Sequence, residues 1–191
     1  MIHKIPISGG PCTGKTTLVE ALHERFPDAY FVDEPATRVI DRELDFAARH
    51  EDYEPKVPWL DYPNFAPLAI VESEALEDVI PYEAGVTFLD RSLVDNIAYG
   101  RINGFEDLIP DVERKIWFAR YSFALICQPL EQYMATEVRR ETAEEALFTH
   151  AAIEEAYRES GLEVVALPPV SIADRVSLVE LALRDHGLVM S

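Results

Sequence analysis

The chain has 191 residues, of which 48% are apolar and 27% are charged, a composition typical of a single globular domain with a buried core. Its 35 acidic residues outnumber its 17 basic ones, so the formal net charge is −18, and such a field disfavours nucleic acid and anionic membranes as partners. No apolar run approaches the roughly 20 residues of a membrane span, and the N-terminus enters a predicted strand without a signal-peptide pattern, so we expect a cytoplasmic protein.

Residues 9–16 carry the most specific signal, because they match the P-loop (Walker A) pattern G-x-x-x-x-G-K-[ST] at every fixed position. The glycines let backbone N–H groups wrap a polyphosphate, and the predicted helix that follows directs the positive end of its dipole at the same phosphates. We expect Lys15 to reach the β and γ oxygens and the Thr16 hydroxyl to hold Mg²⁺. The predicted nucleotide contacts are Gly9, Gly10, Pro11, Cys12, Thr13, Gly14, Lys15, Thr16 and Thr17.

Apolar periodicity predicts strands that alternate with helices along the whole chain. The predicted strands cover residues 3–8, 29–32, 86–89, 121–127 and 162–167, and the predicted helices cover residues 16–26, 37–50, 68–80, 93–99, 111–118, 143–160 and 172–186. The strands are too far apart for hairpins, so the pattern predicts an α/β fold in which a parallel sheet carries helices on both faces. We expect one domain over residues 1–191.

The segment at residues 53–67 interrupts this pattern with four prolines among aromatic residues. It is too aromatic for a linker and too rich in proline for a helix, so we predict an ordered loop. Two interpretations stay open: the loop covers a bound substrate, or it is an aromatic hinge packed on the core.

Two predicted strands end in carboxylates, Asp33 and Glu34 after the second strand and Asp90 after the third. Ligands of open parallel sheets bind beyond the carboxyl ends of the strands, so we expect these side chains to share one cleft with the P-loop. Asp90 is predicted to hold Mg²⁺, with capping of the next helix as the alternative. Either Asp33 or Glu34 can accept the proton of an attacking substrate hydroxyl, and strand alternation cannot choose between them.

Arginines are the candidates for neutralising a phosphoryl group in transfer. Arg91 follows the strand-end Asp90, and Arg139 and Arg140 lie in a segment, 136–145, that can close as a lid and exclude water. Adjacent arginines cannot both face one phosphate without a kink, and ordinary surface ion pairs are the alternative for each. Arg38, one turn into the second helix, is a candidate to hold the acceptor.

Four segments together resemble a known family of P-loop ATPases, AAA_28, described as ATPases or kinases involved in NAD metabolism and similar to the kinase domain of the nicotinamide-riboside kinase/regulator (NadR) proteins. The segments are residues 9–17, 33–38, 89–95 and 138–142. The resemblance implies a three-layer P-loop NTPase fold with five parallel strands, the P-loop strand central and the strand of Asp90 beside it. Deoxynucleoside kinases share the Glu-Pro and Asp-Arg-Ser elements, which implies Glu34 as the base and Arg91 as a phosphate ligand.

These observations predict an enzyme that moves the γ-phosphoryl group of ATP, or of another NTP, with Mg²⁺ to a small nucleoside-like or nucleotide-like acceptor. The alternative is a regulatory nucleotide-binding ATPase without such an acceptor. The base-reading and switch segments of G proteins do not occur in the sequence. The predicted catalytic residues are Lys15, Glu34, Arg91, Arg139 and Arg140, and the predicted substrate-binding residues are Asp33, Glu34, Arg38 and Arg91.

Overall fold

A computed structural model describes residues 1–130 and 142–188 of the chain. Its strands are β1 (His3–Ser8), β2 (Tyr30–Val32), β3 (Val86–Asp90), β4 (Ala124–Cys127) and β5 (Val164–Leu167). Its helices are α1 (Lys15–Arg25), α2 (Pro35–Ala47), α3 (Tyr62–Asp78), α4 (Leu93–Ile102), a 3₁₀ turn (Glu106–Leu108), α5 (Ile109–Ala119), α6 (Ala143–Glu159) and α7 (Ile172–Asp185). The order of strands and helices is the predicted one, including the two successive helices in each of the β2–β3 and β3–β4 connections.

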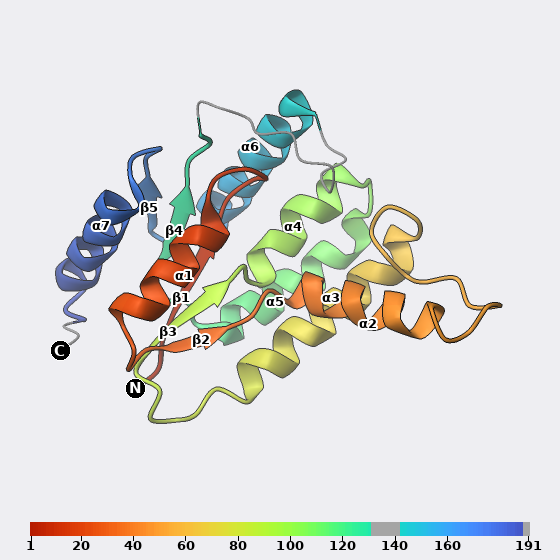
Figure 1. The fold of residues 1–191 in the computed structure, drawn as a ribbon, viewed down its shortest axis with the longest axis horizontal. Coiled ribbons are helices and arrows are strands. Elements are labelled where there is room, and N and C mark those ends of the chain that lie inside the picture. The colour runs from red at the N-terminus through yellow and green to blue at the C-terminus, as the bar shows by residue number, and fades with distance from the viewer. Residues whose placement is uncertain (131–141, 189–191) are drawn as a thin grey trace.

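The strands form one parallel sheet in the order β2-β3-β1-β4-β5 (Figure 1). This confirms the predicted sheet, with the P-loop strand β1 in the centre and the strand of Asp90 beside it. The register pairs Ile7 of β1 with Asp90 of β3. The carboxyl end of β3 therefore lies next to the start of the P-loop.

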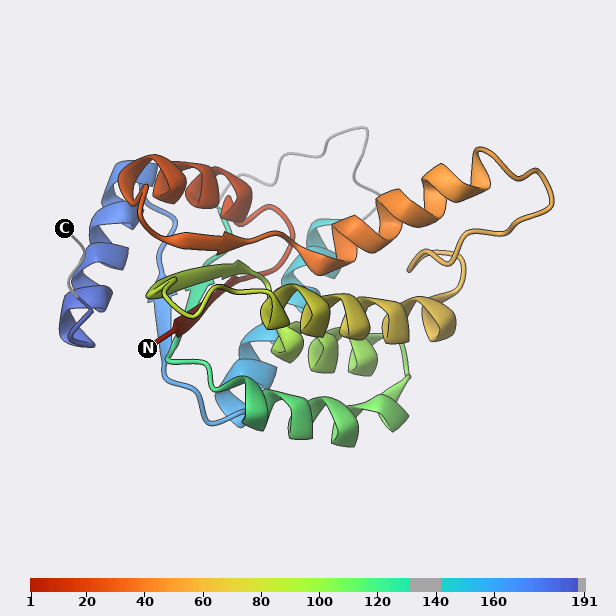
Figure 2. The same ribbon diagram turned by 90° about the horizontal axis from the view of Figure 1, so that it is seen from below.

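Each face of the sheet has its own core, because successive strand residues point to opposite faces. Phe88 and Leu125 pack with α1 and α7 on one face. Leu89 and Ile126 pack with α3, α4, α5 and α6 on the other. Figure 2 shows α1 and α7 together on one side of the sheet and the larger group of helices on the other. The fold is thus the predicted three-layer arrangement.

The α2–α3 pair extends past the sheet and has a small core of its own, in which Val39 packs with Phe65 (Figure 2). Here the prediction of a loop through residue 67 is wrong, since α3 begins at Tyr62. Pro63 occupies the first turn, where a missing N–H costs nothing, and burial of Phe65 offsets the cost of Pro67 inside the helix. Of the helices that the structure describes, none is both long and apolar enough to cross a membrane.

Candidate functional site

The P-loop has the backbone that its glycines predict. Gly9 and Gly14 have φ angles of +145° and +76°, a region that residues with a β-carbon rarely adopt. Gly14 directly precedes α1, so the loop runs into the positive end of that helix. Lys15 is buried, and Thr16 and Thr17 are exposed in the first turn. A loop of this form is suited to hold phosphate oxygens.

Gly10 is needed for a different reason, the close approach of α6. A β-carbon at Gly10 would lie 2.7 Å from Cβ of His150 and 2.9 Å from the carbonyl oxygen of Ala146. The Gly10 N–H donates to Nδ1 of His150 over 3.2 Å. Burial lowers the pKa of His150, which keeps the imidazole neutral and its Nδ1 available as an acceptor. Helix α6 is therefore seated directly on the P-loop.

Lys15 and Asp90 meet at the mouth of the P-loop. The Lys15 ammonium forms a hydrogen-bonded ion pair with Oδ1 of Asp90, as the register of β1 and β3 allows. Burial raises the pKa of the Asp90 carboxyl, while Lys15 opposes that shift and the neighbouring Glu34 adds to it. The predicted strand-end cluster is thus present: P-loop lysine, strand-end aspartate and Glu34 act on one another electrostatically.

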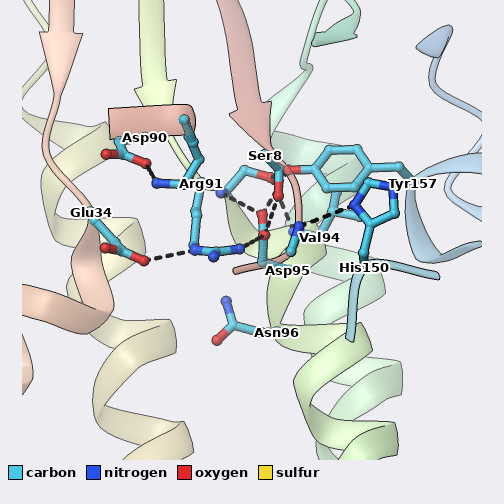
Figure 3. A network of polar contacts seen from close by, with 12 residues as sticks. Ser8, Glu34, Asp90, Arg91, Val94, Asp95, Asn96, His150 and Tyr157 are labelled. Atoms are coloured by element: carbon cyan, nitrogen blue, oxygen red, sulfur yellow. Dashed lines mark hydrogen bonds and ion pairs between the residues drawn. The ribbon is translucent and has the colours of Figure 1, made fainter. Parts of the chain in front are cut away.

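Arg91 connects this cluster to the interior. Its φ of +68° is unusual for a residue with a side chain. Its Nε donates to Oε1 of Glu34 and its Nη1 to Oδ1 of Asp95, both over 2.7 Å. Figure 3 shows the guanidinium between the two carboxylates. Arg91 is therefore held rigidly, with its backbone strain offset by two charge-assisted hydrogen bonds.

Asp95 is the centre of a buried polar network that sequence reasoning missed. Only 3% of it is exposed, yet it accepts hydrogen bonds from the hydroxyls of Ser8 and Tyr157 and from the backbone N–H of Ser92 as well as from Arg91 (Figure 3). With Ser92 it forms the capping box of α4. The Ser-x-x-Asp spacing was a visible signal for that cap, but nothing local indicated the contacts to β1 and α6.

Glu34 binds the Arg91 guanidinium at Nε, whereas Asp95 binds it at Nη1. Glu34 precedes α2, its Oε1 accepts from Arg91, and its Oε2 accepts from the Thr37 hydroxyl over 2.8 Å. Burial raises the pKa of the Glu34 carboxyl, but Arg91, Lys15 and the Thr37 hydrogen bond outweigh it and leave the pKa below its ordinary value. Glu34 is therefore an ionised carboxylate at neutral pH.

A cavity of about 770 Å³ opens beside Glu34 and Arg91. Its volume lies within the range of small-molecule sites, about 300–1,000 Å³. Asp95 and Asn96 also line it, and the rest of its wall combines aromatic and aliphatic groups with polar side chains such as Thr37 and Asn103. The main apolar and aromatic wall residues are Ile40, Trp59, Tyr62, Phe65 and Tyr99.

The remaining predicted site residues fall into two groups. Asp33 and Arg38 pair with each other over 3.2 Å on the surface, and neither lines the cavity, although Glu72 also binds Arg38. Arg139 and Arg140, with most of the predicted lid 136–145, lie outside the described residues. Of the segment 53–67, Pro58, Trp59 and the start of α3 line the cavity together with Glu34.

The family model AAA_28, described as an AAA domain, matches residues 4–175. No curated protein matches the chain. Two solved structures of NadR protein, one in complex with NR and one with NAD and AMP-PNP, are similar with TM-scores of 0.72 and 0.70 at 21% identity. They cover 99% of this chain, which spans only 53% and 51% of theirs, about half of their length.

Two thymidylate kinases are similar over nearly the full length of both chains. That of Ehrlichia chaffeensis has a TM-score of 0.65 at 13% identity and covers 95% of this chain and 98% of its own. That of Candida albicans has a TM-score of 0.58 at 14% identity, with coverage of 99% and 94%. At these identities the likeness shows the fold, that of P-loop kinases.

Proposed function

The chain belongs to the AAA_28 family, and from this premise and the geometry of the site we propose that it is a kinase that transfers the γ-phosphoryl group of ATP to a nucleoside-like acceptor. Nucleotide binding by the P-loop follows from the family and the fold. The observation that carries the further step is the cavity, because Glu34 and Arg91 face it beside the P-loop lysine.

In this proposal Glu34 is the base. Of the two strand-end carboxylates it is the one that lines the cavity, whereas Asp33 is exposed and paired with Arg38. It is ionised at neutral pH and so can accept the proton of a hydroxyl that attacks the γ-phosphorus. Arg91 orients Glu34 and supplies positive charge near the transferring group, and Lys15 reaches the β and γ oxygens.

The ligands for Mg²⁺ are Thr16 and Asp90 in this proposal. One hydroxyl and one carboxylate suit an ion that takes its other ligands from water and substrate phosphates. Among the residues described, no group of three or more His, Cys, Asp or Glu forms a separate metal site. When bound, the ion neutralises charge on the phosphates.

The charges around the cavity favour an acceptor without a phosphate. Within the described ranges, Arg91 is the one basic side chain that lines the cavity, and its guanidinium is already bound by Glu34 and Asp95. A nucleoside monophosphate carries about two negative charges. Among the described residues that line the cavity, no cation is free to pair with them. A neutral or cationic nucleoside meets no such cost, and the aromatic wall offers its base a stacking surface.

The test is phosphoryl transfer followed by ³¹P NMR with Mg²⁺-ATP and a panel of nucleosides, nucleotides and vitamins. We expect a new phosphomonoester signal with one or more nucleosides. Lys15→Ala should abolish it, and Glu34→Gln should lower turnover by about 10²- to 10⁴-fold while ATP affinity stays unchanged. Tight ATP binding with no transfer to any acceptor would refute the kinase and leave a regulatory ATPase. Unchanged turnover in Glu34→Gln would refute the base alone.

A further inference from the structure

Arg175 is a charged residue that the proposed chemistry does not use. It lies in the first turn of α7, its exposed fraction is 0%, and it is the largest fully buried side chain in the described part of the protein. Two general costs oppose this placement: a buried charge loses its hydration, and a cation is disfavoured at the positive end of a helix. A residue kept at such a cost calls for a compensating interaction.

The compensating interactions are three hydrogen bonds to main-chain carbonyls from three loops. Nε donates to the carbonyl of Pro168 after β5 over 2.8 Å, and Nη2 donates to that of Gln128 after β4 over 3.2 Å. Nη1 donates to the carbonyl of Thr13, inside the P-loop, over 2.5 Å. One guanidinium thus ties the phosphate loop to the ends of two neighbouring strands.

The hydrogen bond to the Thr13 carbonyl also sets the direction of the Gly14 N–H. The carbonyl of Thr13 and the N–H of Gly14 belong to the same planar peptide group, and in a trans peptide they point in opposite directions. Nη1 holds the carbonyl from one side of the loop and so directs the Gly14 N–H to the other side. Arg175 also lies close behind this peptide, since a β-carbon on Gly14 would be 3.3 Å from Nη1.

The charge of Arg175 adds to this effect. Its three acceptors are neutral carbonyls, so these bonds give each of its three nitrogens a partner without cancelling its charge. A positive charge in a buried position acts through a lower dielectric than one at the surface, and it increases the attraction of the loop for an anion.

We propose that Arg175 is a positioning residue for nucleotide phosphates: from behind the P-loop it orients the Thr13–Gly14 peptide and adds positive charge to the phosphate cradle. This rests on nucleotide binding by the P-loop, and it goes beyond the proposed transfer reaction. It assigns to α7, which follows the last strand of the sheet, a part in nucleotide affinity.

The test compares the dissociation constants of Mg²⁺-ATP and of inorganic triphosphate, by calorimetry, for the wild type and for Arg175→Met and Arg175→Lys. Hydrogen bonds from charged groups set the scale, so we expect Arg175→Met to weaken both ligands roughly 10- to 100-fold. Arg175→Lys keeps the charge but cannot reach three carbonyls, so its affinity should fall between the other two.

Two controls on the same helix separate this role from mere stability. Arg184→Met removes an equal charge from an exposed position, and Val179→Ala lowers stability by removing buried methyl groups that take no part in the three hydrogen bonds of Arg175. Both should bind ATP as the wild type does. The role of Arg175 is overturned if both Arg175 variants bind ATP as the wild type does, or if Val179→Ala weakens ATP as much as they do. A wild type that binds no nucleotide would instead overturn the premise of a nucleotide-binding P-loop.

Discussion

The two halves of the cleft are built from different kinds of contact. The phosphate half is shaped by backbone: left-handed glycines, a helix end and carbonyls held by one arginine. The acceptor half is shaped by side chains, in which Arg91 and Asp95 anchor a network that reaches β1, α2 and α6. The phosphate half therefore depends on loop geometry, and the acceptor half on the completeness of a buried polar network.

The largest effect should come from breaking the acceptor half at its centre. Asp95→Ala leaves the Arg91 guanidinium and two hydroxyls without their buried acceptor, so we expect the free energy of unfolding to fall by about 3–5 kcal/mol in urea denaturation. Asp111→Ala is the matched control, because that carboxylate pairs with Arg114 at the surface and should cost less than about 1 kcal/mol. Equal losses in the two variants would contradict the central place of Asp95.

A smaller loss should come from the phosphate half, through Gly10→Ala. The new methyl group overlaps His150 and the Ala146 carbonyl, so α6 must move. We expect the free energy of unfolding to fall by about 1–3 kcal/mol and ATP to bind more weakly. Gly104→Ala is the control, because a β-carbon there meets no atom within 4 Å and only its φ of +65° is unfavourable. If Gly10→Ala binds ATP as tightly as the wild type, the contact of α6 with the P-loop does not contribute to nucleotide affinity.

The smallest effect should be a shift in pH dependence that sharpens the role of Glu34. Its pKa is held below the ordinary value of about 4.3, so the base is ionised above that pH and activity falls only as the pH drops through the folded-state pKa. Thr37→Val removes one hydrogen bond that favours the ionised form, so the acid limb of kcat/KM should move to higher pH. An acid limb that stays in place, with the enzyme active, would show that Glu34 does not set it.

The same division explains what could be read from the sequence. The P-loop and the strand-end carboxylates were predicted because their signals are local: a fixed glycine spacing, and apolar runs that end in acids. The order of the strands came from the family resemblance. These predictions concern the P-loop and the edge of the sheet where the strands end.

The unpredicted features depend on contacts between residues far apart in the chain. Arg175 lies 162 positions from Thr13, and Tyr157 lies 62 positions from Asp95. Hydrophobic periodicity reports which face of an element is buried but not which element it meets, so these contacts gave no signal. The start of α3 was missed because Pro63 and Pro67 suggested a loop, whereas tertiary packing of Phe65 outweighed that local preference.

The most direct test of the account is a competition between a nucleoside and its own 5′-monophosphate, mixed in equal amounts with Mg²⁺-ATP and followed by ³¹P NMR. We predict that the monophosphate signal grows and that no diphosphate of that nucleoside forms, because among the described residues the cavity offers no uncommitted cation to a phosphate. A diphosphate formed from the monophosphate, with the nucleoside untouched, would contradict the account of the acceptor half.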